Sequence, residues 1–269
     1  MLVFLGHVDV VPTGPENEWE HDPFSGYDDG TFINGRGTGD MKGGIACFMS
    51  ALSRIDVDSL NYSIGFLITA DEEGPSKDGT VKVVEELLQR NEKIDYCLIG
   101  EPSTLETVGD NIRIGRRGSI NIELEVLGKQ GHAAYPARVD NPIHKVVPFL
   151  DKLLKEVWDE GNEHFPPTSL QLTNITAGVG AHNVTPNNLY LKFNLRFSTQ
   201  ISGEAIQEKV ENFLKSEGIK HKVSFDINAE PFYSEPKLFT NVVCQSIEDV
   251  QGFKTCLLYT SDAADDWFC

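Results

Sequence analysis

The chain has 269 residues, of which 40% are hydrophobic and 24% are charged, as is ordinary for a globular protein with one large or two smaller domains. Its 41 acidic and 23 basic residues give a formal net charge of -18, which argues against nucleic acid or an anionic membrane as the main partner. No apolar run reaches the roughly 18 residues that span a bilayer, and the first residues lack the basic flank of a signal peptide.

Short apolar runs and helical patterns alternate in the first part of the chain. Runs of the buried-strand type cover residues 2–5, 64–69 and 96–99, and helical spacing covers residues 43–52 and 79–88. This alternation is typical of an α/β sheet covered by helices, so we predict such a domain over residues 1–117.

A different pattern begins at Gly118. Half-buried strands are predicted over residues 120–126, 169–176, 189–197 and 221–227, and helices over residues 143–154 and 205–214. The order β-α-β-β-α-β is that of the ferredoxin-like split unit, so we expect an inserted domain over residues 118–231. A helical pattern at 236–250 then returns the chain to the first domain over residues 232–255.

Both ends of the chain look incomplete. A buried strand begins almost at Met1, and domains rarely start inside a central strand, so we expect residues to be missing upstream. Residues 256–269 resemble the translation of a transposase adapter used in sequencing libraries, and we expect this tail not to be native. The cysteines are odd in number and scattered, which favours a reducing cytoplasm over a disulfide framework.

Polar side chains follow each apolar strand of the first domain. The residues concerned are His7 and Asp9, then Asp71, Glu72 and Glu73, then Glu101, with Asp40 in a glycine-rich loop before a helix. In open α/β sheets, ligands bind beyond the carboxyl ends of the strands. Carboxylates gathered there repel one another unless cations neutralise them, and imidazole together with carboxylates suits zinc better than calcium.

Each motif has a weaker interpretation when it is taken alone. A His-x-Asp sequence is common at surfaces, adjacent glutamates are usually solvated, and Glu-Pro after a strand is often only a turn. The loop Gly35–Gly44 could bind phosphate, but it lacks the spacing of a P-loop. The joint order and placement of the motifs carries the prediction of a metal site.

Four of these motifs together resemble those of the M20 metallopeptidase family. They are HVDVVP at 7–12, GDMKGG at 39–44, DEEG at 71–74 and GEP at 100–102. The resemblance covers residues 2 to about 255. It implies a zinc-hydrolase sheet domain with an inserted ferredoxin-like lid, through which the protein forms a homodimer.

The resemblance also implies two zinc ions per subunit, for which cobalt could substitute. His7 and Glu101 would hold one ion, Glu73 would serve the second, and Asp40 would bridge both. The resemblance implies three catalytic residues. Asp9 and Glu72 lie close to these ligands in the sequence, and His132 lies in the lid.

Each catalytic residue has an expected role. Asp9 would hydrogen-bond His7 and fix its ring. Glu72 would take a proton from the attacking water and return it to the leaving amine. His132, from the lid of the partner subunit, would donate to the negative oxygen of the intermediate. Without the motif GKQGHAAYP at 128–136, His132 would be interpreted as a surface histidine.

Further local matches lie in the desuccinylase branch of the family, at 69–80, 115–119 and 140–144. They imply hydrolysis of N-succinyl-LL-2,6-diaminopimelate to succinate and LL-2,6-diaminopimelate, in lysine and diaminopimelate biosynthesis. Arginine is the natural partner of the succinyl carboxylate. The expected substrate contacts are Arg116, Ser119, Tyr135, Asn183 and Arg196. Arg196 alternates with the apolar residues of its predicted strand and so belongs to the polar face. A side chain that is simply exposed to solvent is therefore the alternative interpretation.

The chain departs from the family pattern in its C-terminal part. The family's last metal ligand is a histidine near the C-terminus, and no histidine follows His221 here. The glycine- and threonine-rich substrate loop before it is also missing. Without the histidine, the second zinc would have only Asp40 and Glu73 as ligands. We therefore predict that the natural gene product is active and that this chain is inactive or severely impaired. Robust turnover by this chain would contradict that prediction.

Two other functions stay open. One is acetylornithine deacetylase, or a related aminoacylase or carboxypeptidase on the same scaffold. The other is a catalytically dead metal-binding or dimerisation module. The intact Glu72 argues against the second, because a protein that only binds metal does not need a free base.

Overall fold

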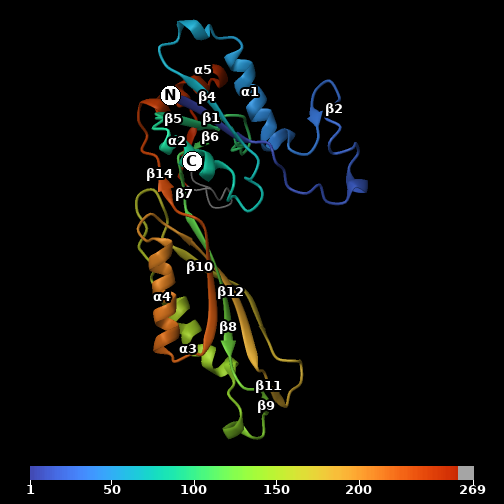
Figure 1. Ribbon diagram of the computed structural model, residues 1–269, viewed down its shortest axis with the longest axis vertical. Coiled ribbons are helices and arrows are strands. Elements are labelled where there is room, and N and C mark those ends of the chain that lie inside the picture. Colours follow the sequence, from blue (N-terminus) through green and yellow to red (C-terminus); the bar gives the residue numbers. More distant parts are fainter. Residues whose placement is uncertain (260–269) are drawn as a thin grey trace. The chain divides into compact units, whose positions relative to one another are not determined.

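The computed structural model describes residues 1–259. Contacts between residues divide the chain into two compact units, Met1–Thr104 and Leu105 onward, and both are drawn in Figure 1. The domain boundaries that we expect at residues 117, 231 and 255 stay predictions. Residues 260–269 of the expected adapter-like tail lie outside the described residues.

A three-stranded parallel sheet forms the centre of the first unit. Its strands are β1 (Leu2–His7), β4 (Ile64–Thr69) and β5 (Tyr96–Ile99), in the order β4-β1-β5. All three coincide with predicted apolar runs. In the central strand, Gly6 has no room for a side chain, because a Cβ there would lie 2.7 Å from the side chain of Ile45. Helix α1 (Gly43–Leu52) therefore packs directly on the backbone of β1.

The other elements of the first unit are short. They are η1 (Glu16–Glu18), the hairpin β2 (Tyr27–Asp28) and β3 (Ile33–Asn34), the irregular turn η2 (Thr38–Lys42), η3 (Val57–Ser59) and helix α2 (Thr80–Gln89). Helix α1 has the predicted bounds, and α2 begins and ends one residue later than predicted. A Cβ at Gly44 would lie 2.4 Å from the carbonyl oxygen of Gly100, so only glycine lets α1 approach the end of β5 this closely.

A four-stranded antiparallel sheet dominates the second unit. Its strands are β8 (Gly118–Leu127), β10 (Ser169–Ala177), β12 (Asn188–Phe197) and β13 (His221–Ala229), in the order β10-β12-β8-β13. Helices α3 (Pro142–Lys155) and α4 (Gly203–Ser216) connect them. Each helix begins at a side-chain cap, since Asn141 accepts from the N–H of Ile143 and Ser202 accepts from the N–H of Ala205.

The core of the second unit follows from the alternation along its strands. Inward side chains of β8 and β12, such as Ile122 and Phe193, pack against the apolar stripes of α3 and α4, which include Phe149 and Val210. The residues between them point to the other face of the sheet, where the Glu123 carboxylate pairs with the Lys192 ammonium at 2.6 Å.

Short strand pairs complete the second unit. They are β6 (Asn111–Arg113) with β15 (Cys256–Leu258), β7 (Gly115–Arg116) with β14 (Phe232–Tyr233), and β9 (Gly131–His132) with β11 (Val184–Thr185). Turn η4 (Pro136–Arg138) and helix α5 (Leu238–Gln251) are the remaining elements. The segment that we expect not to be native thus begins with a strand. No helix within residues 1–259 is long and apolar enough to cross a bilayer.

Candidate functional site

The carboxyl ends of β1, β4 and β5 bring the predicted metal ligands of the first unit together. His7 is the last residue of β1 and pairs with Thr69 at the end of β4, while Leu5 pairs with Ile99 at the end of β5. The loops that follow β4 and β5 therefore start beside His7. Asp40 reaches the same edge from η2, directly before α1.

His7 lies at the centre of this cluster, and its side chain is only 2% exposed. Its Nε2 atom lies 3.1 Å from Asp40 Oδ1, 3.3 Å from Glu101 Oε1 and 3.8 Å from Glu72 Oε2. Its Nδ1 atom lies 2.9 Å from the main-chain carbonyl oxygen of Asp9, to which a protonated Nδ1 donates. In the neutral ring the Nε2 lone pair then faces the carboxylates, which is the arrangement of a metal-binding histidine.

The expected hydrogen bond between Asp9 and the His7 ring is made by the main-chain carbonyl of Asp9. Its carboxylate Oδ1 is 3.5 Å from His7 Nδ1. The other carboxylate oxygen accepts from the N–H groups of Glu72, at 3.1 Å, and Glu73, at 3.0 Å. Asp9 therefore joins the loop after β1 to the loop after β4.

Burial and crowding shift the titration of the cluster. Burial raises the pKa of Glu101 to about 7, and the nearby charge of Asp40 adds to this effect. The pKa of Glu72 is also raised, chiefly by burial. Burial lowers the pKa of His7, but the Asp9 carbonyl and the charges of Glu101 and Glu72 outweigh it, so the pKa of His7 is raised. Without a cation, the cluster keeps protons that an isolated carboxylate loses.

The donor atoms fit a divalent transition metal. Within residues 1–259, two groups place their ligand atoms within 4.8 Å of one another: His7, Asp40 and Glu101, and His7, Glu72 and Glu73. One imidazole with several carboxylates suits zinc and its neighbours in the periodic table. The first group consists of three predicted ligands. The second combines Glu73 with Glu72, whereas we expected Glu73 to share an ion with Asp40.

We expect the affinity of this cluster for Co²⁺ to rise between about pH 6 and about pH 8. Glu101, with a pKa of about 7, and His7, with a raised pKa, must both be unprotonated to act as ligands. At a pH below the pKa of a ligand, the metal must displace a proton from that ligand. The apparent affinity then falls about tenfold for each unit by which the pH is lowered. Titration calorimetry in two buffers of different ionisation enthalpy measures both the affinity and the protons released.

Glu101→Gln has no proton to lose at residue 101 but also lacks a proposed ligand, so it is the control for the metal-free protein. Protonated Glu101 also stabilises the metal-free fold, and this contribution is lost as the pH rises through about 7. The metal-free chain should therefore lose more thermal stability over this range than the Glu101→Gln variant. Co²⁺ affinity that does not change with pH in the unsubstituted chain would contradict the expectation.

One group of predicted residues in the second unit surrounds His132. The N–H of Ala133 donates to the carbonyl of Asn183 at 2.9 Å, and the ring of Tyr135 lies 5.7 Å from the ring of His132. The N–H of Ala134 donates to His132 Nδ1 at 3.1 Å. The neutral imidazole therefore carries its proton on Nε2, and this nitrogen is available as a hydrogen-bond donor.

The remaining predicted substrate contacts lie at the other end of the same sheet. Ser119 pairs with Arg196 across β8 and β12 and is 4% exposed, and Arg116 lies in β7, just before β8. Figure 1 shows β7 and β9 at opposite ends of β8. About 25 Å of strand separates Ser119 from the His132 loop, since β8 extends to Leu127. A small substrate cannot contact both groups of one chain.

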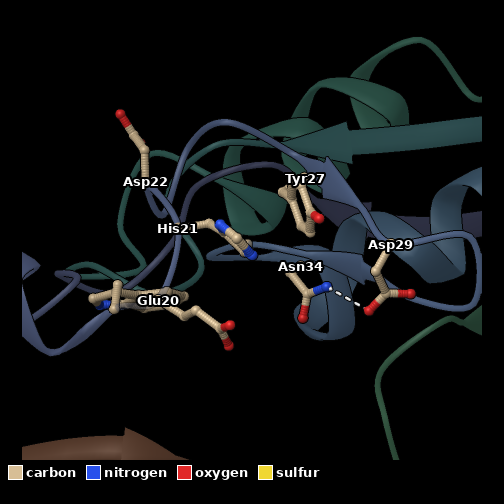
Figure 2. A pocket seen from close by; sticks show the side chains of 8 residues that line it. Glu20, His21, Asp22, Tyr27, Asp29 and Asn34 are labelled. Carbon is tan, nitrogen blue, oxygen red and sulfur yellow. Dashed lines mark hydrogen bonds between the residues drawn. The ribbon is translucent and has the colours of Figure 1, made fainter.

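A hollow of about 270 Å³ lies beside the β2–β3 hairpin of the first unit. Figure 2 shows that its wall includes His21 and Tyr27, whose rings lie 3.6 Å apart, and Asp29, which is bonded to Asn34. The Asp29 carboxylate also accepts from two N–H groups of its own turn. No predicted site residue lines this hollow.

Sequence reasoning missed the side chains that hold the loop after β4. The Asp71 carboxylate accepts from the N–H groups of Ser76, Lys77 and Asp78, and the Ser76 hydroxyl donates to the carbonyl of Glu72 at 2.7 Å. The signal in the sequence is an Asp three residues before the run Gly74-Pro75-Ser76, which is typical of a side-chain-stabilised turn.

Comparison with known proteins gives one family and several similar chains. Residues 3–266 match the profile of peptidase family M20/M25/M40. The chain is 47% identical to a succinyl-diaminopimelate desuccinylase of Hahella chejuensis, over its whole length and 70% of the relative. It is 45% identical to one of Psychromonas ingrahamii, over its whole length and 72% of the relative.

Two solved structures share the fold. An M20 family metallo-carboxypeptidase from Sulfolobus solfataricus superposes with a TM-score of 0.77 at 18% identity, covering 97% of this chain and 71% of the other. Human carnosine dipeptidase 1 superposes with a TM-score of 0.62 at 19% identity, covering 96% of this chain and 68% of the other.

Proposed function

Because the chain belongs to peptidase family M20/M25/M40, we propose that its full-length gene product is a metal-dependent amide hydrolase of the cytoplasm. Its proposed reaction is the hydrolysis of N-succinyl-LL-2,6-diaminopimelate to succinate and LL-2,6-diaminopimelate, in lysine and diaminopimelate biosynthesis. The observation that carries this proposal is the similarity of the whole chain to relatives named succinyl-diaminopimelate desuccinylase. The cluster around His7 supports it.

The proposed ligands lie at the ends of the parallel strands. His7, Asp40 and Glu101 would hold one zinc ion, and Glu73 with Asp40 would hold a second; cobalt could replace zinc. When bound, the ions polarise the amide carbonyl and lower the pKa of a water molecule. Within residues 1–259 we assign only Asp40 and Glu73 to the second ion, so we propose that the full-length gene product is the active form. The experiments on turnover below use that form.

Glu72 is the proposed general base. Its side chain is 51% exposed and its Oε2 atom lies 3.8 Å from His7 Nε2, so it borders the cluster and stays open to water and substrate. Its raised pKa makes it a stronger base. The carboxylate takes a proton from the attacking water and then gives it to the nitrogen of the leaving amine, so it ends the cycle unprotonated.

The oxygen that becomes negative in the reaction needs a donor, and we assign this role to His132 of the partner subunit. The bond from Ala134 to Nδ1 supports it, because it leaves the proton on Nε2. Tyr135 and Asn183 would accompany His132. At the other end of the sheet, the guanidinium groups of Arg116 and Arg196, with Ser119, would bind the succinyl carboxylate.

The proposed dimer forms through residues 118–231 as a ferredoxin-like lid. The order β8-α3-β10-β12-α4-β13 and the sheet order β10-β12-β8-β13 support this assignment. Strand β10 is a sheet edge that exposes Ile175, and α3 exposes Val147 and Leu154. An exposed edge strand beside exposed apolar side chains is a surface that a second copy can cover.

Substrate preference tests the proposed reaction directly. We expect the zinc-supplemented full-length gene product to favour succinyl-diaminopimelate over acetylornithine by about 100-fold in kcat/KM, or about 3 kcal/mol of transition-state discrimination. Parallel assays of the two substrates with one enzyme preparation measure this ratio. Comparable rates, or a preference for acetylornithine, would move the substrate to other members of the family and leave the hydrolase intact.

Arg116→Ala should affect the two substrates unequally. Loss of a charged hydrogen bond to the succinyl carboxylate should lower kcat/KM for succinyl-diaminopimelate by roughly 10- to 100-fold. Residual hydrolysis of acetylornithine should change little, because its acetyl group carries no charge. Arg90→Ala, which removes an exposed arginine of the first unit paired with Glu86, is the matched control. Equal losses on both substrates would remove Arg116 from succinyl recognition.

A further inference from the structure

The proposed general base lies outside the sheet. Strand β4 ends at Thr69 and helix α2 begins at Thr80, so Glu72 and Glu73 belong to the loop between them. Neither residue is part of a strand or a helix, so other groups must fix the backbone there. A general base nevertheless needs a fixed position, because a small misplacement of a catalytic group costs much of the rate.

Side chains hold both backbone polar groups of Glu72. Its N–H donates to the Asp9 carboxylate at 3.1 Å, and its carbonyl accepts from the Ser76 hydroxyl at 2.7 Å. Ser76 has a φ of 53°, in the left-handed region that is unfavourable for residues other than glycine. The bond from Ser76 to Glu72 therefore depends on something that keeps Ser76 in this conformation.

The Asp71 carboxylate supplies that restraint. Its Oδ1 atom accepts from the N–H of Ser76 at 3.2 Å, and its Oδ2 atom accepts from the N–H groups of Lys77, at 2.7 Å, and Asp78, at 2.8 Å. Three amide donors on one carboxylate close residues 71–78 into a turn. The turn is tight, since a Cβ at Gly74 would lie 2.8 Å from Asp71 Oδ1.

We propose that Asp71 is a positioning residue that orients Glu72 and Glu73 through the closed turn 71–78. This inference rests on the proposed function, because it explains how the base and a metal ligand of that reaction are held. Both carboxylate oxygens of Asp71 are engaged by main-chain amides, so the side chain acts on its neighbours and not on the substrate or a metal.

Two substitutions separate this role from a simple effect of charge. Asp71→Ala removes all three acceptor contacts. Asp71→Asn removes the charge but keeps one oxygen, which can still accept from the N–H groups of Lys77 and Asp78. Positioning predicts a severe loss for Ala and a mild one for Asn, whereas an effect of charge predicts equal losses.

The matched control is Asp29→Ala. Asp29 also closes a turn of the first unit, by accepting from the N–H groups of Thr31 and Phe32 in the hairpin of Figure 2. That turn carries no predicted site residue. The substitution therefore removes the same kind of contact at a place where the proposal predicts no effect on turnover.

Turnover and amide hydrogen exchange test the proposal together. In the zinc-loaded full-length gene product, Asp71→Ala should lower kcat about tenfold or more while KM changes less than about threefold. In this chain, the amides of Ser76, Lys77 and Asp78 should exchange at least about tenfold faster in Asp71→Ala. Asp71→Asn should keep most of both properties, and Asp29→Ala should match the unsubstituted protein in both.

Each other outcome overturns the proposal. Equal losses of kcat in Asp71→Ala and Asp71→Asn would mean that Asp71 acts through its charge and not by positioning. Faster amide exchange with unchanged kcat would mean that the turn is only structural. If Asp71→Ala fails to fold, Asp71→Asn decides between the outcomes. Faster amide exchange at Ser76 alone, together with a small loss of kcat, supports the proposal. Unchanged exchange and unchanged kcat overturn it. If the unsubstituted full-length protein shows no turnover, the proposed function is wrong. If that protein is active but the Asp71 variants do not behave as expected, only the positioning role of Asp71 is wrong.

Discussion

Glu72→Gln is expected to lower kcat of the zinc-loaded full-length gene product by roughly 10²- to 10⁴-fold, the usual contribution of a general base. Glutamine has nearly the size and shape of glutamate but cannot take a proton from water. The main-chain bonds of residue 72 to Asp9 and Ser76 do not depend on its side chain, so the loop should keep its conformation.

Metal binding distinguishes a base from a ligand. Because Glu72 belongs to the second of the two possible ligand groups, Co²⁺ affinity must be measured beside kcat. We expect this affinity to change less than about threefold in Glu72→Gln. Glu85→Gln is the control, since Glu85 is an exposed glutamate of α2 that pairs with Lys82. Loss of metal together with activity would make Glu72 a ligand, and retention of both would exclude it as the base.

Two inactive variants are expected to restore one another when they are combined. His132→Ala alone should lower kcat roughly 10²- to 10³-fold, because the developing negative charge loses its donor. Equal amounts of His132→Ala and Glu72→Gln subunits should regain about one quarter of native turnover, because random assortment makes about half of the dimers mixed and each mixed dimer has one intact site.

The physical basis of this complementation is the length of β8. Ser119 and His132 lie at opposite ends of one sheet, so one chain cannot bring both to the same small substrate. In the proposed dimer, each site therefore takes its His132 from the partner subunit. Co-expression with two affinity tags isolates the mixed dimers for assay. The double variant carrying both substitutions in one chain, mixed with itself, is the control. No recovery in purified mixed dimers would place both residues in the site of a single chain.

The longer elements were predictable from the sequence because their patterns repeat several times. Helix α1 and strands β4 and β5 have the predicted bounds, and β8 and β12 extend the predicted alternation by one or two residues. Strands of two or three residues, such as β9 and β11, were missed, because so few residues carry no period. They form where longer elements bring two segments side by side.

Burial was predicted less well in the first unit. The runs at β4 and β5 look like strands buried on both faces, yet Phe66 and Ile99 are 37% and 50% exposed. Both strands are edges of the three-stranded sheet in the described part of the chain. An apolar run indicates that a strand can be buried, but the neighbours of the strand decide whether it is.

The sequence indicated which side chains would gather around His7, because motif order and strand polarity place them at one edge. It did not indicate how they are held. The use of the Asp9 carbonyl for His7 and of its carboxylate for Glu72 and Glu73 depends on backbone positions that no residue pattern encodes. The residues after Asp71 are typical of a side-chain-stabilised turn, but which three amides donate to its carboxylate became evident only in the structure.

The central place of β1 has a consequence for synthesis of the protein on the ribosome. Of the residues in the cluster, His7 is synthesised first, but the strands that flank β1 come much later in the chain. The set of acidic partners is complete only when Glu101 has been added. Until then the nascent chain has no formed site. An ion that binds only the folded arrangement shifts the equilibrium toward that fold. Metal that is present while the chain is made would therefore raise the fraction of finished chains that is folded.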